Sequence, residues 1–389
     1  MTGTEVLAAV RDLLPALRER AQETEDLRRL PGETVKSLQE CGFFTLLQPG
    51  RYGGAAASPV HFYEAVTLLG SACGSTGWVA SVLGVHPWHV ALFDDRAQQE
   101  VWGEDVHTRI SSSYAPAGRA TPVPGGFRFG GRWSFSSGCD HATWVLLGGL
   151  VLGEDGRPVD FRTFLLPIAD YTIVDVWDTV GLRGTGSNDI LVEDVFVPEH
   201  RTLSFSHTAQ CVCPGQEVNP EPVYRLPYGT VHPFAITAPI IGMARGAYEA
   251  HVGHTRARLR AAYLGEKAAE DPFAQVRVAE AASDIDAAWL QLRHTVEEEL
   301  ALAEQGARIP VTTRLRARRD QVLGTARAIG ALDRLFESAG GKAINNGLPI
   351  PRFWRDAHAA RAHAANDVER ALVMFGRNEL GIPVREGMF

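Results

Sequence analysis

"GLRGTGSNDILVEDVFVP", residues Gly181 to Pro198, is the stretch from which the fold of this chain is most easily read. Three glycines at its start predict a tight turn, and the β-branched run from Asp189 to Pro198 predicts a strand. Such glycines also occur in phosphate-binding loops, but the Lys-Ser/Thr ending and the strand-then-helix context of those loops are missing. The stretch therefore predicts a glycine turn that leads into a strand.

Neighbouring segments have the same short-strand character. They include "GGFRFGGRWSFSSG", "ATWVLLGGLVL" and "RTFLLPI", which are β-branched or aromatic and are bounded by Gly, Pro or Asp. Short strands with turns at these intervals predict a compact β-barrel or sandwich from about Thr108 to Phe205. The next segment, Ser206 to Tyr228, contains "CPGQEVNPEP" and is predicted to be a loop.

Helical spacing dominates on both sides of this β region. From Thr4 to about Gln99, and again after Val231, apolar residues recur every three or four positions. Examples are Val6, Val10, Leu13, Leu14 and Leu17, and then Val278, Ala281, Ile285, Ala288, Trp289, Leu292, Val296 and Leu300. The prediction is a mainly α protein with a β domain: an N-terminal helical domain (1–107), a central β-barrel domain with a loop (108–230) and a C-terminal helical bundle (231–389).

Composition and charge exclude several classes of protein. The 389 residues include 38 Lys and Arg against 46 Asp and Glu, and the scattered basic residues argue against nucleic acid or an anionic membrane as the main partner. The first residues lack the pattern of a signal peptide, and no apolar run approaches the roughly 18 residues of a membrane span. Five widely spaced cysteines argue against a disulfide framework, so a cytoplasmic location is expected.

Paired histidines raise the question of a metal site. "HPWH" places His86 and His89 three residues apart, and "HVGH" does the same with His251 and His254. Neither pair has a nearby Cys or carboxylate that completes a known metal-binding spacing. No metal site is predicted.

Two serine-rich segments are better candidates for a binding site. They are "RISSSYAPAG" (Arg109 to Gly118) and "WSFSSGCDHATW" (Trp133 to Trp144), in which consecutive serines stand beside aromatic residues. Hydroxyl and backbone N–H groups in this arrangement can face a planar polar heterocycle. Serine pairs are also common in plain turns, so the pattern alone leaves both interpretations open.

These segments, in this order, resemble the acyl-CoA dehydrogenase superfamily. "SSSYAPAG" and "WSFSSG" look like its two flavin-contacting loops, "GLRGTGSNDILVEDVFVP" like its signature strand, and "RARLRAAYLGEK" like the arginine-bearing stretch that reaches a neighbouring subunit's cofactor. The resemblance covers essentially the whole chain. It implies an N-terminal helical domain, a central β-barrel and a C-terminal four-helix bundle.

Further motifs narrow the resemblance. "ACGSTGWV", "GVHPWHVALFD", "SSGCDHATW" and "FWRDAHAARAHAANDVERA" look like the group D two-component flavin-dependent monooxygenases. Within that group they are most similar to the oxygenase components that hydroxylate a phenolic secosteroid in bacterial steroid degradation. The loop "HTAQCVCPGQEVNPEPV" departs from the pattern of the steroid enzymes, so an aromatic polyketide or another phenol is also a candidate substrate.

A missing carboxylate separates this chain from the dehydrogenases that it resembles. Their glutamate base would fall at Ala364, or in a second subgroup near His232. Without that carboxylate, removal of a proton α to a thioester has no evident base. Acyl-CoA dehydrogenase activity is therefore a lesser alternative. The segment "WRDAHAARAHAAND" is predicted to be one helix that carries both His358 and His363, about 140° apart around its axis.

The resemblance implies a mechanism and assigns residues to it. A separate reductase supplies reduced FMN or FAD, which reacts with O2 to a C4a-hydroperoxide and ortho-hydroxylates a phenol. Ser137, with Ser136 beside it, should accept a hydrogen bond from the flavin N5–H. His86 and Ser112 match positions that bind the phenol oxygen, with His86 taking the phenolic proton. His363 matches the position beside the peroxide, where it can position that group and donate a proton.

The same resemblance predicts further cofactor contacts and an assembly. The predicted cofactor-binding residues are Ser113, Tyr114, Trp133, Ser136, Arg260, Gln275, Gly340 and Gly341, of which the last four lie where the superfamily contacts flavin phosphates or the far end of FAD. Because those contacts cross between subunits, a homotetramer is expected. His89, His141 and His358 are interpreted as structural. Two other functions stay open, namely N-oxygenation of an amino sugar or other amine, and a non-catalytic flavin carrier.

Overall fold

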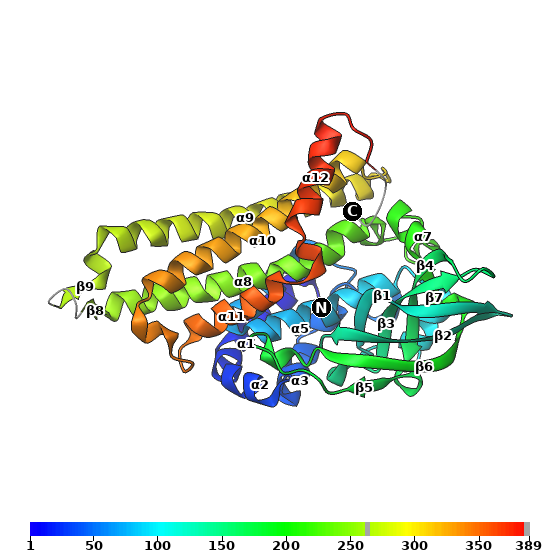
Figure 1. Cartoon of the computed structure of the whole chain (residues 1–389), viewed down its shortest axis with the longest axis horizontal. Helices are drawn as coiled ribbons and strands as arrows, with labels where there is room; N and C mark the ends of the chain where they lie inside the picture. Colours follow the sequence, from blue (N-terminus) through cyan, green and yellow to red (C-terminus); the bar gives the residue numbers. More distant parts are fainter. Residues whose placement is uncertain (261–264, 385–389) are drawn as a thin grey trace.

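The computed structural model describes residues 1–260 and 265–384, without the side chains of Arg260 and Lys342. The chain begins with helices, continues with a sheet and ends with long helices, in the order that the sequence predicts (Figure 1). The N-terminal helices are α1 (Gly3–Glu19), α2 (Ala21–Leu27), α3 (Gly32–Glu40), α4 (Pro59–Ala72), α5 (Gly74–Val90) and α6 (Asp95–Trp102). The domain limits themselves stay a prediction.

Helix α1 shows how local sequence sets these elements. Thr2 caps its first turn in a capping box with Glu5, which satisfies two of the free backbone N–H groups at the helix start. The predicted apolar face is buried at Val6, Val10 and Leu17 and packs towards α4.

Seven strands form one sheet among the described residues. They are β1 (Ile110–Val123), β2 (Gly126–Ser136), β3 (Trp144–Leu152), β4 (Pro158–Pro167), β5 (Thr172–Val174), β6 (Asn188–Pro198) and β7 (Thr202–Ser204). Their order is β5-β6-β2-β1-β3-β4-β7, and only β1 and β3 are parallel. Strand β6 is the predicted strand after the glycine turn. These pairings form an open series, so closure into a barrel stays a prediction.

The C-terminal part is built on one central helix. The elements are α8 (Tyr228–Ala257), β8 (Leu259–Arg260), β9 (Glu266–Lys267), α9 (Pro272–Glu304), α10 (Val311–Ser338), α11 (Pro349–Arg361) and α12 (Val368–Glu379). Helices α9, α10 and α11 pack against α8, whose first seventeen residues are all buried. Among the described residues, no helix is both long enough and apolar enough to cross a membrane.

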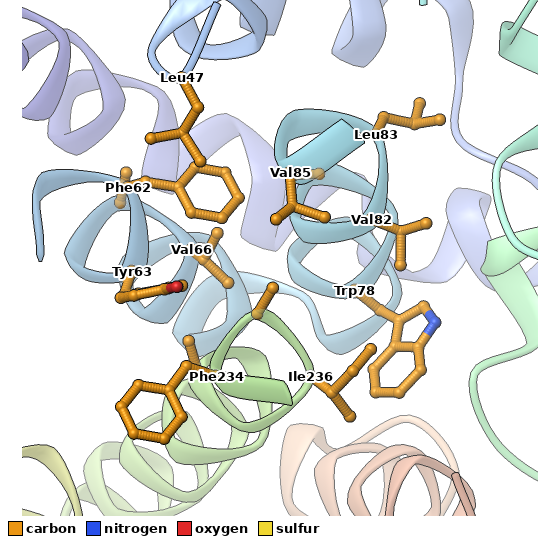
Figure 2. Close-up of a cluster of buried hydrophobic side chains, with 14 of the residues drawn as sticks. Leu47, Phe62, Tyr63, Val66, Trp78, Val82, Leu83, Val85, Phe234 and Ile236 are labelled. Carbon is orange, nitrogen blue, oxygen red and sulfur yellow. The ribbon is translucent and has the colours of Figure 1, made fainter. Parts of the chain in front are cut away.

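One hydrophobic core joins the N-terminal and C-terminal helices. Helices α4 and α5 pack on α8, with Phe62 and Tyr63 of α4, Trp78 of α5 and Phe234 and Ile236 of α8 in the same cluster (Figure 2). All of α5 is buried, so this helix has no solvent face. Any polar side chain on α5 therefore needs a partner inside the protein.

Two predictions of local structure are wrong. The segment predicted to be a loop, Ser206 to Tyr228, contains most of a short helix, α7 (Phe205–Gln210), and two 3₁₀ turns. Helix α11 ends at Arg361, so His358 and His363 do not share a helix. The helix stops because Asn366 turns back and donates its side-chain N–H to the carbonyl of Ala360 at 3.1 Å.

Candidate active site

His86 lies in the buried helix α5 with one ring nitrogen committed and the other free. Its Nδ1 is 2.5 Å from the backbone oxygen of Ile110 in β1. A carbonyl only accepts, so Nδ1 carries the proton and Nε2 is the acceptor in the neutral ring. Nε2 is buried and has no partner among the described residues. Burial lowers the pKa of His86 to about 4, which keeps the imidazole neutral near pH 7.

Aromatic and imidazole rings surround this free nitrogen. His89 Nδ1 lies 2.8 Å from the hydroxyl of Tyr114, and the His86 and Tyr114 rings are 6.2 Å apart. Tyr114 stands edge-on to His232 at 5.1 Å, and His232 stacks on Tyr228 at 5.1 Å. Desolvation lowers the pKa of His89 to about 3 and that of His232 well below its ordinary value. The result is an uncharged, ring-lined site.

Ser112 belongs to the same group of residues. It is buried in β1, two residues before Tyr114 on the same strand. The family resemblance predicted Ser112 as a contact of the phenol oxygen and Tyr114 as a cofactor contact. It missed Tyr228, and it named His232 only as an alignment position and His89 only as structural. The spacing of "HPWH" was the available signal for His89.

His363 reaches the ring cluster from the turn after α11. Its ring lies 5.8 Å from that of Trp78 and 6.4 Å from that of His232. Nδ1 accepts from the backbone N–H of Ala365 at 3.1 Å, so the neutral ring carries its proton on Nε2. Desolvation, with a smaller contribution from Arg318, lowers the pKa of His363 to about 4. His86 and His363 are thus set as opposite partners, an acceptor and a donor.

A serine pair lies at the other side of Trp78. The register between β2 and β6 shifts between Trp133 and Ser136, and Phe135 at this bulge has a left-handed φ of 69°. A bulge re-aims the side chains that follow it. Ser137 Oγ accepts from the Trp78 indole N–H at 3.1 Å, whereas the buried Ser136 hydroxyl has no partner among the described residues.

These groups fit a flavin at Ser136 and Ser137. A buried hydroxyl without a partner costs free energy, and a ligand with ring N–H and C=O groups removes that cost. Ser137 also retains acceptor capacity beside the ring cluster that holds His363. Among the described residues no group of three or more His, Cys, Asp or Glu side chains is arranged to hold a metal ion.

The remaining predicted cofactor residues lie elsewhere in the chain. Ser113 donates to the Ser134 backbone oxygen at 2.8 Å. The Trp133 indole N–H is used by the oxygens of Gly148 and Ala115, and its ring lies in the core of the sheet beside Phe129. The structure therefore gives Trp133 no free polar group for a cofactor.

Four predicted residues lie at the end of the long helices that is remote from the sheet (Figure 1). Gln275 is in the first turn of α9 and donates to the Ala269 oxygen at 3.0 Å. Gly340 and Gly341 follow α10, and a Cβ at Gly340 would lie 2.2 Å from the guanidinium of Arg258. Arg260 is in β8, and its side chain lies outside the described residues. Within one chain, these residues are not brought to Ser137.

Comparison with known proteins shows the family of this chain. Residues 4–108 match the family model "Acyl-CoA dehydrogenase, N-terminal domain", and residues 234–368 match "Acyl-CoA dehydrogenase, C-terminal domain". The chain is 61% identical to "Flavin-dependent monooxygenase, oxygenase subunit HsaA" of Rhodococcus jostii (strain RHA1), over 97% of this chain and 98% of that protein. It belongs to the oxygenase subunits of flavin-dependent monooxygenases.

Other similar proteins support the same assignment. The crystal structure of the HsaA monooxygenase from M. tuberculosis superimposes on this oxygenase with a TM-score of 0.96, at 57% identity and 100% coverage of both chains. The oxygenase is also 36% identical to "FADH(2)-dependent resorcinol hydroxylase, oxygenase component" of Rhizobium sp. (strain MTP-10005), over 97% of this chain and 93% of that protein. The oxygenase thus depends on a flavin. Ala364, the position predicted for the glutamate base of the dehydrogenases, is exposed.

Proposed function

We propose that this oxygenase subunit ortho-hydroxylates a phenol with reduced flavin and O2. The observation that carries the proposal is that two histidines in one ring-lined site differ in the nitrogen that carries the proton: one offers an acceptor nitrogen and the other a donor N–H. His86 offers a buried acceptor nitrogen, because Nδ1 is held by Ile110. His363 has its proton on Nε2, because Nδ1 accepts from Ala365. A phenol hydroxyl needs the first, and oxygen transfer needs a proton donor such as the second.

His86 prepares the phenol for reaction. A substrate hydroxyl that donates to Nε2 replaces the missing partner of this nitrogen, and proton transfer to the imidazole makes the ring carbon ortho to the oxygen more nucleophilic. The imidazolium formed would stand beside the phenolate, which offsets its cost of burial. Ser112, which is buried two residues before Tyr114 in β1, would help to hold the oxygen end of the substrate.

His363 acts on the cofactor side of the same site. Its donor nitrogen can orient the oxygen that is being transferred and return a proton to the oxygen that is left. The surrounding rings of Trp78, His232 and Tyr228 keep water away, which limits loss of reducing equivalents as H2O2.

Reduced flavin, when bound, supplies the activation of O2. Ser137 would hold the flavin N5–H. Ser136, whose hydroxyl has no partner in the described part of the chain, would hold a neighbouring polar group. Both FMN and FAD fit these groups, and a separate reductase would deliver the reduced form. The name of the resorcinol hydroxylase relative favours FAD for that protein.

A phenolic secosteroid is the substrate that the sequence resemblance favours, and an aromatic polyketide is the next candidate. The rings of Tyr114 and Tyr228, which lie 5.8 Å apart, and the apolar side chains of the neighbouring core suit a fused ring system with one phenol. N-oxygenation of an amine would leave the acceptor nitrogen of His86 without a use, so it is the weaker candidate.

A product assay tests the proposal. The oxygenase is supplied with O2 and enzymatically reduced FMN or FAD, and is offered a secosteroid phenol, a simple phenol, an aromatic polyketide and an amino sugar. We expect a catechol from at least one phenol, and its loss in His86→Phe, which keeps a ring but removes the acceptor. Oxygenation of the amine alone, or H2O2 release with no oxygenated product, would contradict the proposal.

We also propose a homotetramer in which cofactor contacts cross between subunits. Gln275, Gly340 and Gly341 lie far from Ser137 within one chain, so they can serve a flavin only in another copy. Light scattering should give about four times the 42.3 kDa of one chain. Mixed assemblies of Ser137→Ala and Gln275→Ala subunits should recover activity that neither variant has alone. A monomer at working concentration would rule this assembly out.

A further inference from the structure

Three buried hydroxyl groups form a line behind the serine pair. Thr185 Oγ1 lies 2.9 Å from the backbone oxygen of Leu182, and Ser187 Oγ lies 2.6 Å from Thr185 Oγ1. Ser137 Oγ lies 2.7 Å from Ser187 Oγ. All three side chains are buried, with at most 6% of each residue exposed. Nothing in the mechanism above uses Thr185 or Ser187.

The groups at the two ends give this line one direction. The Leu182 carbonyl can only accept, so Thr185 donates its single proton there. Thr185 can then only accept from Ser187, and Ser187 in turn can only accept from Ser137. At the other end the Trp78 indole N–H can only donate, and it donates to Ser137. The Ser137 hydroxyl proton is therefore already committed.

Further hydrogen bonds fix the position of Leu182, at the end of the line. The Leu182 N–H donates to Asp356 Oδ1 at 2.6 Å, and its oxygen also accepts from the Trp177 indole at 2.9 Å. Reversal of the line would point the Thr185 oxygen at this carbonyl without a proton between them. Two oxygen lone pairs would then face each other at 2.9 Å, which is unfavourable in a buried environment.

We propose that Thr185 and Ser187 are positioning residues that make Ser137 an acceptor only, and so make the site select reduced over oxidised flavin. The proposal rests on the proposed placement of flavin N5 at Ser137. Reduced flavin carries a hydrogen on N5, which Ser137 can accept with its remaining lone pair. Oxidised flavin has only a lone pair on N5, which would face another lone pair. A site of this kind takes up the reduced cofactor and releases the oxidised one.

Two substitutions test the direction of the line. Ser187→Ala removes the acceptor of the Ser137 proton, which can then turn to an oxidised N5. Thr185→Val leaves Ser187 free to donate to Ser137, which can then donate to the flavin. In both variants we expect oxidised flavin to bind about threefold to tenfold more tightly, with reduced flavin changed less, because one net hydrogen bond is gained. A tenfold change in the affinity ratio equals about 30 mV in the two-electron potential of the bound flavin.

Equilibrium titrations with oxidised flavin, and anaerobic titrations with reduced flavin, give the two Kd values. Ser187→Thr keeps the hydroxyl and should restore the wild-type ratio. Thr67→Val is the matched control, because Thr67 is also buried and donates to a backbone oxygen, that of Ala238, at 3.2 Å. Thermal unfolding identifies any variant that does not fold, in which case the other variant gives the result.

The outcomes separate this proposal from the placement on which it rests. If Ser137→Ala leaves both Kd values unchanged, flavin N5 does not lie at Ser137, and both ideas fall. If Ser137→Ala weakens reduced flavin but folded Ser187→Ala and Thr185→Val keep the wild-type ratio, the placement stands and the directed line is refuted. A lower ratio of oxidised to reduced Kd in either variant, absent in Thr67→Val, supports the proposal.

Discussion

His363 shows how much depends on the state of one side chain. Its Nδ1 caps the turn at Ala365, so its N–H is available to the site. In His363→Asn the side-chain oxygen can replace Nδ1 as the cap, since Asn is a favourable capping residue, but the donor at the Nε2 position is lost. We expect flavin binding to persist and the yield of hydroxylated product per O2 to fall by about 10²-fold, the lower end for acid–base groups. Product and H2O2 measured together check this.

His358→Asn is the control for this substitution. His358 stacks on Trp354 at 4.1 Å, and its ring nitrogens contact the Trp354 oxygen and the Asp333 carboxylate. These contacts hold His358 away from the ring cluster. The product yield per O2 of His358→Asn should therefore stay close to that of the wild type. Equal yields in the two variants would remove His363 from the mechanism.

At the scale of the element, the end of α11 determines where His363 lies. Asn366 donates to Ala360 in the last turn of the helix and accepts from Gln321 and Thr325 of α10. Asn366→Ala removes these buried hydrogen bonds. We expect the free energy of unfolding to fall by about 1–3 kcal/mol, and product yield per O2 to fall as His363 loses its position. Chemical denaturation and the coupled product assay measure the two effects.

Asn378→Ala provides the comparison on the next helix. Asn378 lies near the end of α12, and its side chain makes only an exposed contact with Glu379 at 3.4 Å. The free energy of unfolding should change by no more than about 0.5 kcal/mol, and the product yield per O2 should stay close to that of the wild type. A loss of stability in Asn366→Ala with a normal yield would show that the turn holds His363 without Asn366.

For the whole molecule, buried neutral histidines predict sensitivity to acid. Burial lowers the pKa of His86 to about 4 and of His89 to about 3, against 6.5 in the unfolded chain. Above pH 6.5 both states are neutral and there is no penalty. Below pH 6.5 these histidines bind protons in the unfolded chain but stay neutral in the folded chain. The free energy of unfolding therefore falls as the pH falls. Between pH 7.5 and 5.5 each histidine should cost about 1.4 kcal/mol.

Denaturation at these two pH values measures this dependence. His89→Gln should reduce the change in unfolding free energy between the two pH values by the contribution of one histidine. His294→Gln is the matched surface substitution, because that side chain is 76% exposed on α9. An unchanged pH dependence in His89→Gln would mean that His89 binds a proton as readily in the folded protein as in the unfolded chain, which would contradict the prediction.

Features that depend on local pattern were predicted well. The order of helices, sheet and helices, the apolar face of α1 and strand β6 follow from residue spacing, which adjacent residues alone can encode. The serines of β1 and β2 were marked as site candidates because their motifs are contiguous, and their role stays a prediction. The predicted continuous helix from Trp354 to Asp367 failed for the opposite reason. Its end is set by Asn366, which is tied to Gln321, 45 residues away.

The chemical state of the site comes from contacts between distant segments. The family resemblance carried by local motifs marked His86, Ser137 and His363 as candidates. It could not say which nitrogen of His86 is free, since that depends on Ile110, 24 residues later. Nor could it show that Trp78 and Ser187 both engage Ser137, across 59 and 50 residues. Hydrogen-bond direction depends on which donor and which acceptor meet, and only the folded chain brings these groups together.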